Sequence, residues 1–206
     1  AVSVEVSSLS QAVFRKEVLL FLSIGILLQF SHAPYYTFYT LFLEEHGYSK
    51  GLAGHLWALG VLAEIVLFIY AHRLFLRITD YALLTLSLWL TALRWLLIAE
   101  FPHELSVLIF AQVLHAASYG ACHAASMRLL RQYFPCKLEA HGQALYVSVC
   151  FGAGGAIGAW YAAYGWSHYS ETFIFLAAAI ACVAAALLAM YVSSTSAGAK
   201  LSGKQA

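Results

Sequence analysis

The chain has 206 residues, of which 62% are apolar and 10% are charged, and its formal net charge is +1 at pH 7. Soluble domains contain about 25% charged residues, so this composition excludes an ordinary soluble protein and favours one that lies in a lipid bilayer. The small net charge gives no reason to expect a nucleic-acid partner. The four cysteines show no zinc-ligand spacing, and neither a metal nor a cofactor is expected.

Six apolar stretches are long enough to cross a bilayer, which takes about 20 helical residues each. None alternates with a period of two, so the predicted fold is all-α, a polytopic protein with six transmembrane helices. We expect a cytoplasmic linker over residues 1–14, a six-helix bundle over 15–192, and a disordered tail over 193–206. The predicted spans are 18–43, 52–74, 81–99, 105–127, 142–164 and 171–192.

Basic residues gather at alternate connections between these spans. Nine of the eleven precede span one, follow span six, or lie after spans two and four. Of the other two, Lys50 lies on the opposite face and Arg94 lies within a span. By the positive-inside rule, both termini are cytoplasmic. The chain begins with Ala and has no signal peptide before span one, so we expect it to be part of a longer protein.

Polar residues of the first span share a helical face. Gln29, His32 and Tyr36 recur at helical spacing, and in lipid such a stripe should turn towards the protein interior. We interpret these three as candidates for substrate binding. Two neighbouring tyrosines are interpreted instead as anchors at the membrane interface, Tyr35 and Tyr39.

Three ionisable side chains fall near mid-membrane in three successive spans: Glu64, Arg94 and His115. At 1.5 Å per residue each lies about 15–20 Å from the end of its span, so their heights permit contact. A charge at this depth costs about 2.5–3.5 kcal/mol even on lenient scales, which favours a functional role. The proton affinity of a carboxylate depends on its distance from a guanidinium, and histidine can relay a proton. We therefore assign proton coupling to these residues. The alternative is a static charge pair that holds helices together.

The fourth span carries the most polar stripe and is expected to line the central face of the bundle. Its residues are Gln112, His115, Ser118, Tyr119 and Cys122. Tyr119, with Trp57 of the second span, completes the candidate substrate-binding set, because aromatic faces can stack on a ring or a sugar.

The last two spans contain few polar residues. In span five, Gly154 and Gly158 form a Gly-x-x-x-Gly pair, which is typical of close helix packing, although a flexible gating helix is an alternative. Span six is rich in Ala and Leu, and we expect it to lie at the periphery and face lipid.

Several motifs resemble a known family. They are Leu56-Trp57-Ala58-Leu59-Gly60-Val61-Leu62-Ala63-Glu64, Leu93-Arg94-Trp95, Gln112-Val113-Leu114-His115 and Cys122-His123. With them, residues 15–192 resemble the C-terminal half of a major facilitator superfamily transporter, in the phenylpropionate-transporter-like group related to the lactose permease. The resemblance implies an inner-membrane protein whose N-terminal six helices, or a second copy, complete a twelve-helix transporter.

The resemblance also suggests residue roles. It implies that Glu64, Arg94 and His115 correspond to the glutamate, arginine and histidine of proton and sugar coupling in the permease. A second carboxylate of that pattern is replaced here by Ser118. This departure places more weight on Glu64 as the proton carrier.

The sequence thus predicts a proton-coupled symporter, not an enzyme, with protons and a small organic solute as its partners. An aromatic or other organic acid is the first choice, because an arginine fork suits a carboxylate. A sugar or nucleoside is the second, since Arg94 could be committed to Glu64. Two other classes remain as alternatives. A rhomboid-type protease needs a serine setting that Ser118 and Ser126 lack, and a haem-binding bundle would use His32 and His115 as axial ligands.

Overall fold

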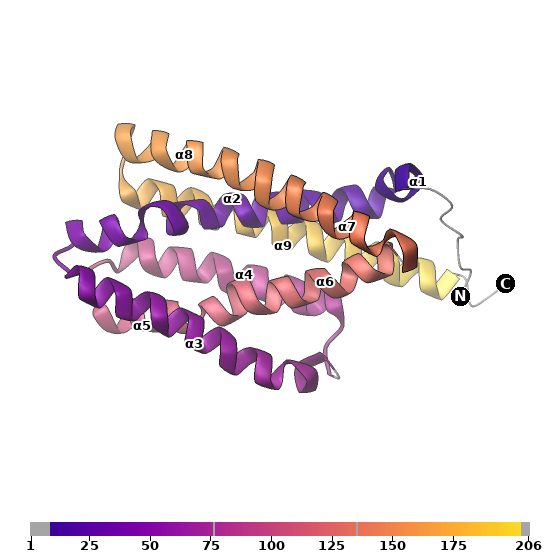
Figure 1. The fold of residues 1–206 in the computed structure, drawn as a ribbon, viewed down its shortest axis with the longest axis horizontal. Helices are drawn as coiled ribbons and strands as arrows, with labels where there is room; N and C mark the ends of the chain where they lie inside the picture. Colours follow the sequence, from indigo (N-terminus) through magenta and orange to yellow (C-terminus); the bar gives the residue numbers. More distant parts are fainter. Residues whose placement is uncertain (1–8, 76, 135, 203–206) are drawn as a thin grey trace.

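The structure is a computed structural model that describes residues 9–75, 77–134 and 136–202. These residues form a bundle of long antiparallel helices (Figure 1), and six helical segments are long and apolar enough to span a membrane, which confirms the predicted all-α class and the six spans. The first three spans lie in α2 (Lys16–Glu45), α3 (Lys50–Phe75) and α4 (Asp80–Glu100). The fourth comprises α5 (Leu105–Val113), a π-helical segment η1 (Ala116–Ala121) and α6 (Cys122–Tyr133).

The fifth span comprises α7 (Glu139–Tyr146), a second π-helical segment η3 (Val147–Gly154) and α8 (Gly155–His168). The sixth lies in α9 (Glu171–Ser202), and two short helices complete the structure, α1 (Leu9–Val13) and η2 (Cys136–Leu138). The last helix continues to Ser202 through most of the segment expected to be a disordered tail, whose residues 203–206 lie outside the described residues.

The contacts between helices follow an exchange pattern. The first span (α2) packs against the fifth (η3 and α8) and the sixth (α9), while the fourth packs against the second (α3) and the third (α4). If spans one, two and three are exchanged for spans four, five and six, the contacts of span one with spans five and six become those of span four with spans two and three. At the centre of the bundle, α4 packs against α9. The bundle therefore consists of two interlocked three-helix units, as expected from the sequence, and their contacts follow a repeat that was not evident in the sequence itself.

Glycines allow α8 to approach the backbone of α2. Pro34 lies inside α2 and lacks the N–H that would otherwise bond to the Phe30 carbonyl four residues earlier. A Cβ on Gly158 would lie only 2.8 Å from that carbonyl oxygen, and one on Gly154 would lie 3.0 Å from the carbonyl oxygen of Ile26. Only glycine permits these separations without movement of the chain.

The sixth span is less peripheral than its composition suggested. One face of α9 is buried against α2 and α4 through small side chains, among them Ala178, Cys182 and Ala185. The opposite face exposes Ile180 and Leu187. The expectation of a lipid-facing helix therefore holds for one face only, because small residues allow the other to pack closely.

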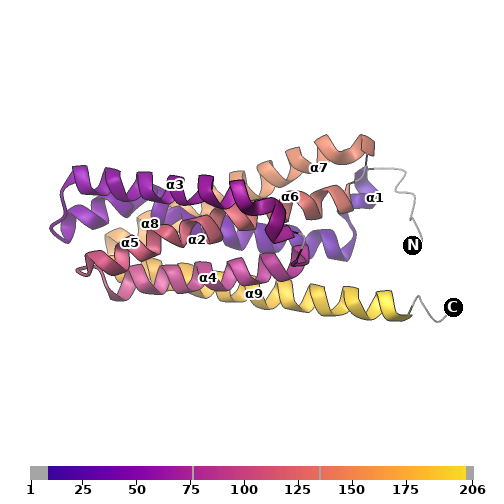
Figure 2. The ribbon, with the colours of Figure 1, turned by 90° about the horizontal axis from the view of Figure 1, so that it is seen from below.

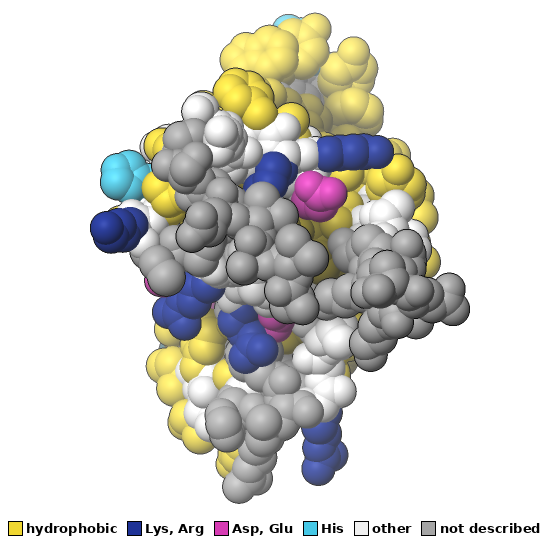
Figure 3. Space-filling view, turned by 90° about the vertical axis from the view of Figure 1, so that its right-hand side faces the viewer, with side chains coloured by type: hydrophobic (Ala, Val, Ile, Leu, Met, Phe, Trp, Pro, Cys, Tyr) yellow, Lys and Arg dark blue, Asp and Glu magenta, His cyan; other side chains and the backbone are white. Residues whose placement is uncertain are grey.

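Helix α1 and the C-terminal end of α9 lie at the same end of the bundle (Figures 1 and 2). Lysine and arginine side chains gather on this end (Figure 3), which we call the basic end. Here Asp80, at the start of α4, accepts hydrogen bonds of 2.6 Å from Arg128 and from Gln132 of α6. Thr79 caps the same helix by accepting a bond from the amide of Ala82.

Candidate functional site

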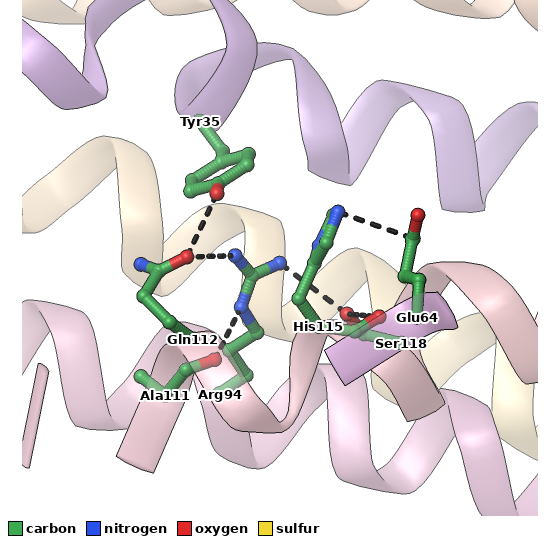
Figure 4. Close-up of polar contacts among 7 residues, drawn as sticks. All are labelled: Tyr35, Glu64, Arg94, Ala111, Gln112, His115 and Ser118. Atoms are coloured by element: carbon green, nitrogen blue, oxygen red, sulfur yellow. Dashed lines mark hydrogen bonds and ion pairs between the residues drawn. The ribbon is translucent and has the colours of Figure 1, made fainter. Parts of the chain in front are cut away.

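Glu64 of α3 and His115 of the fourth span meet in the polar core of the bundle. Oε1 of Glu64 lies 3.3 Å from Nε2 of His115, and a dashed line joins the two side chains in Figure 4. Two glycines allow this approach. A Cβ on Gly60 would lie 3.3 Å from the His115 ring, and one on Gly120 would lie 3.0 Å from Leu67 of α3, so glycine at both positions lets α3 and the fourth span lie close together. Two of the three residues assigned to proton coupling are therefore in contact.

The third residue, Arg94 of α4, has other partners. Its guanidinium donates to the carbonyl oxygen of Ala111 at 2.8 Å, to Ser118 at 3.3 Å and to Gln112 at 3.4 Å (Figure 4). No carboxylate of the described residues lies within 4 Å of it. Ser118, which stands where the permease pattern has a carboxylate, is thus a neutral partner of Arg94. Arg94 is not committed to Glu64 in this structure.

Aromatic rings enclose the Arg94 side chain. Its guanidinium carbon lies 4.2 Å from the ring centroid of Tyr35 and 4.6 Å from that of Trp95. With these rings and its three polar partners around it, Arg94 is 0% exposed. Such cation–π contacts stabilise a desolvated guanidinium by about 0.5–2 kcal/mol each.

Tyr35 and Tyr39 are core residues, so the prediction that they anchor the helix at the membrane interface is wrong. Both are fully buried. Tyr35 donates to Oε1 of Gln112 at 2.8 Å, and Tyr39 accepts from Nε2 of the same amide at 2.6 Å. These two tyrosines are functional candidates that the sequence did not suggest, whereas their partner Gln112 was expected in the polar stripe of span four. The available signal was their i, i+4 spacing on a helix opposite the polar stripe of span four.

The polar stripe of span four faces into the bundle. Gln112 and Ser118 are fully buried, whereas Tyr119 is partly exposed. The expectation that span four lines the central face of the bundle stays a prediction. The buried residues supply acceptors for Arg94.

His32 is buried beside Trp95, with ring centroids 5.0 Å apart. Its Nδ1 lies 2.9 Å from the carbonyl oxygen of Leu28, an acceptor, so in the neutral ring Nδ1 carries the proton. Nε2 then carries a lone pair and has no hydrogen-bond partner among the described residues. Nδ1 of His115 is likewise enclosed with no hydrogen-bond partner in the described part of the chain.

Three further candidates form an aromatic surface beside the Glu64–His115 pair. The Tyr36 ring lies 6.1 Å from Trp57 and 6.3 Å from Tyr119, and the Tyr119 ring lies 5.7 Å from His115. Tyr36 is 47% exposed, so this surface is open. The last candidate, Gln29, is buried where α2 meets Gly154 of η3.

Six apolar spans around a polar core with an exposed aromatic surface are the features of a polytopic membrane transport protein. Residues 2–177 match the family model described as the MFS_1 like family, and the chain belongs to this family. This confirms the predicted major facilitator superfamily transporter and favours a transporter over an enzyme.

One curated relative is the probable 3-phenylpropionic acid transporter of Escherichia coli (strain K12), which is 36% identical over 110 residues. The aligned region covers 53% of this chain and 29% of that protein. The chain thus matches less than a third of the length of this relative. No solved structure matches the chain significantly.

Proposed function

We propose that this chain belongs to a proton-coupled symporter of a small organic acid and that Glu64 and His115 couple the proton to transport. The contact between these two residues is the observation that carries the proposal. It places a carboxylate beside an imidazole in the core of a membrane bundle, where ionisable groups mark proton and substrate paths. Neither Lys nor Arg of the described residues lies within 4 Å of Glu64 to neutralise it permanently.

The placement of the pair supports a coupling mechanism. Glu64 belongs to the first three-helix unit and His115 to the second. Movement of this six-helix bundle against a second six-helix half during alternating access changes the surroundings of the pair, and hence the free energy of a proton on Glu64. Arg94 contributes a fixed positive charge behind the pair, and its partners hold its position.

The aromatic surface and the relative both support an aromatic acid as the substrate. Tyr36, Trp57 and Tyr119 provide faces on which a phenyl ring can stack. The relative is named as a probable transporter of 3-phenylpropionic acid. We extend that substrate class to this chain, with the two histidines as polar contacts.

A sugar or nucleoside is the second candidate, and a specific observation favours it. The guanidinium of Arg94 is enclosed, so the exposed part of the site offers rings and hydroxyls but no arginine fork. Hydroxyls of Tyr36 and Tyr119 and the ring nitrogens of histidine serve neutral ligands equally well.

We further propose that the chain works with a second six-helix half, either another part of the same polypeptide or a second copy. The large apolar face of α3, which includes Leu62, Ile65 and Ile69, is exposed and available for such a partner or for lipid. The basic end (Figure 3) is assigned to the cytoplasm by the positive-inside rule, with both termini there, and the bacterial relative supports an inner membrane.

Uptake by the complete transporter in proteoliposomes tests the substrate and the coupling together. We expect labelled 3-phenylpropionate to accumulate when the outside is acidic and to carry protons with it. A labelled disaccharide and a labelled nucleoside test the alternative. Uptake of only the neutral compounds, with no proton-coupled uptake of the acid, would exclude the organic-acid proposal.

A further inference from the structure

Because Arg94 is enclosed, another group of this six-helix bundle must bind the carboxylate of a substrate acid. All three nitrogens of its guanidinium donate to groups of the protein, and Tyr35 and Trp95 cover it. Opening this network to a ligand would leave the acceptors on Gln112 and Ser118 unsatisfied, at about 1–3 kcal/mol each. A ligand at the exposed aromatic surface therefore contacts a different ionisable group before it could reach Arg94.

That group is Glu64. Its Oε1 is enclosed beside His115. That oxygen accepts no hydrogen bond from the described residues, and 17% of the Glu64 side chain remains exposed. A carboxylate is an unfavourable neighbour for an anion, unless one proton is present between them.

The groups around Glu64 do not supply another cation. The fourth span presents His115 and Tyr119, and α2 presents Tyr35 and Tyr36, which interact with Glu64 electrostatically. From α4, Arg94 acts on Glu64 across a distance greater than that of an ion pair. Among the described residues that face Glu64, only a histidine or Glu64 itself can therefore bring a mobile proton to a ligand at this position.

The geometry points to a shared proton: the substrate carboxylate binds to Glu64 as an acid–carboxylate pair that holds one proton between two oxygens. This inference rests on the proposed function and specifies its substrate as a monocarboxylate with an apolar ring. The O–H···O⁻ bond of such a pair is short and among the stronger hydrogen bonds in proteins. Like-charge repulsion ensures that two carboxylates this close do not both ionise.

Two histidines, His32 and His115, complete the proposed binding site. Nε2 of His115 lies 3.3 Å from Oε1 of Glu64, which leaves the exposed part of the carboxyl group for the ligand. His32 and His115 both flank the ring of Tyr119, at 6.0 and 5.7 Å between centroids, and each has one ring nitrogen without a partner. These are buried polar atoms that a bound ligand, or a water that accompanies it, would satisfy.

The proton balance follows directly. A proton from the outer solution protonates Glu64, the substrate anion accepts a hydrogen bond from it, and the proton and anion leave together on the other side. Each monocarboxylate therefore carries one proton, and transport is electroneutral. The anion alone is repelled by ionised Glu64, so binding of either partner strengthens binding of the other.

Binding of 3-phenylpropionate to the complete transporter, measured by calorimetry as a function of pH, tests the inference. At pH values above the pKa of Glu64 in the free protein, the dissociation constant of 3-phenylpropionate should rise about tenfold per pH unit, because each binding event takes up one proton. In Glu64→Gln the amide supplies a permanent donor, so we expect binding that no longer depends on pH. The control Glu45→Gln makes the same change at an exposed helix end and should keep the wild-type slope.

A second measurement needs no variant. The neutral amide 3-phenylpropionamide can donate to ionised Glu64, so its affinity for the wild-type protein should not fall as the pH rises. If the amide and the acid weaken in parallel, or if Glu64→Gln keeps the wild-type slope, the shared proton is excluded. In either case, proton-coupled uptake of the acid by the wild type would leave the proposed function intact.

Discussion

Oε1 of Glu64 lies 3.3 Å from Nε2 of His115, and the two residues come from different three-helix units of the bundle. The contact joins α3 to the fourth span at the start of its π-helical segment, which follows His115. Gly60 and Gly120 allow the two helices to lie close at this point. Segments of π-helix often mark functional sites, since they interrupt the regular helical hydrogen bonds. We therefore expect a conformational change of the transporter to alter the electrostatic environment of this pair.

The first prediction concerns Arg94→Lys. A lysine ammonium is a compact charge and lacks the planar fork that reaches Ala111, Gln112 and Ser118 together. Each buried acceptor left without its donor costs about 1–3 kcal/mol, so we expect a markedly lower melting temperature in detergent. Arg77→Lys, at an exposed position, is the matched control. Equal melting temperatures for both variants would show that the Arg94 network contributes little to stability.

The second prediction compares two neighbouring glycines of α8. A Cβ on Gly158 would lie 2.7 Å from Cβ of Ala33, whereas one on Gly155 would meet nothing within 4 Å. Gly158→Ala should force α8 away from α2 and destabilise the bundle by about 1–3 kcal/mol. Gly155→Ala should be neutral or stabilising by up to about 1 kcal/mol, because alanine favours the helix. Thermal unfolding of the two variants side by side would test this, and the reverse order of stability would contradict the α2–α8 contact.

The spans were predictable because their signal is local. Each apolar run is long enough to cross a bilayer, and the depths of Glu64 and His115 follow from the helical rise alone. Their contact depends in addition on how each helix is rotated about its axis. That rotation is set by packing against neighbours, through glycines such as Gly60 whose role becomes evident only in three dimensions.

The errors arose where the environment of a residue is not local. Tyrosines near the ends of transmembrane helices usually lie at the interface, which led to the wrong assignment of Tyr35 and Tyr39. In the structure, Gln112 from a distant span provides their hydrogen-bond partner and makes burial favourable. Similarly, an alanine-rich α9 without polar residues looks lipid-facing, although small side chains such as Ala185 are what allow its other face to pack.

The third prediction concerns the basic end. Asp80 is 9% exposed and accepts two bonds of 2.6 Å from α6, whereas Glu139, 37% exposed, pairs with Arg131 at 3.0 Å. Asp80→Asn should lower stability, because a buried charge-assisted interaction that contributes about 1.5–3 kcal/mol is weakened. Glu139→Gln should change stability by less than about 1 kcal/mol, as exposed ion pairs usually do. Melting temperatures at low and high salt would separate them, and a larger effect of Glu139→Gln would contradict the assignment.

The fourth prediction concerns Gly60→Val. The nearest atoms to a Cβ at this position are Cδ2 of His115 at 3.3 Å and Oε1 of Gln112 at 3.4 Å. A branched side chain should displace the imidazole from Glu64 and impair proton-coupled uptake more than expression. Gly54→Val, on the same helix with nothing within 4 Å of its Cβ position, should retain uptake. Transport assays normalised to protein in the membrane provide the comparison, and full activity of Gly60→Val would show that the contact tolerates displacement.

The last prediction separates coupling from binding through Glu64→Gln in the complete transporter. Glutamine keeps the size of the side chain and a donor for the ligand but cannot release a proton. We therefore expect the variant to lose accumulation of 3-phenylpropionate against its gradient while it still exchanges internal for external substrate. Exchange requires only that the loaded site reorient, whereas accumulation requires the proton to leave with the substrate and the empty carriers to return. Counterflow and acid-driven uptake measured in the same proteoliposomes distinguish the two activities, with Glu45→Gln as the control at an exposed position. If Glu64→Gln still concentrates the acid and carries protons with it as the wild type does, Glu64 is a structural residue and the proton is carried elsewhere.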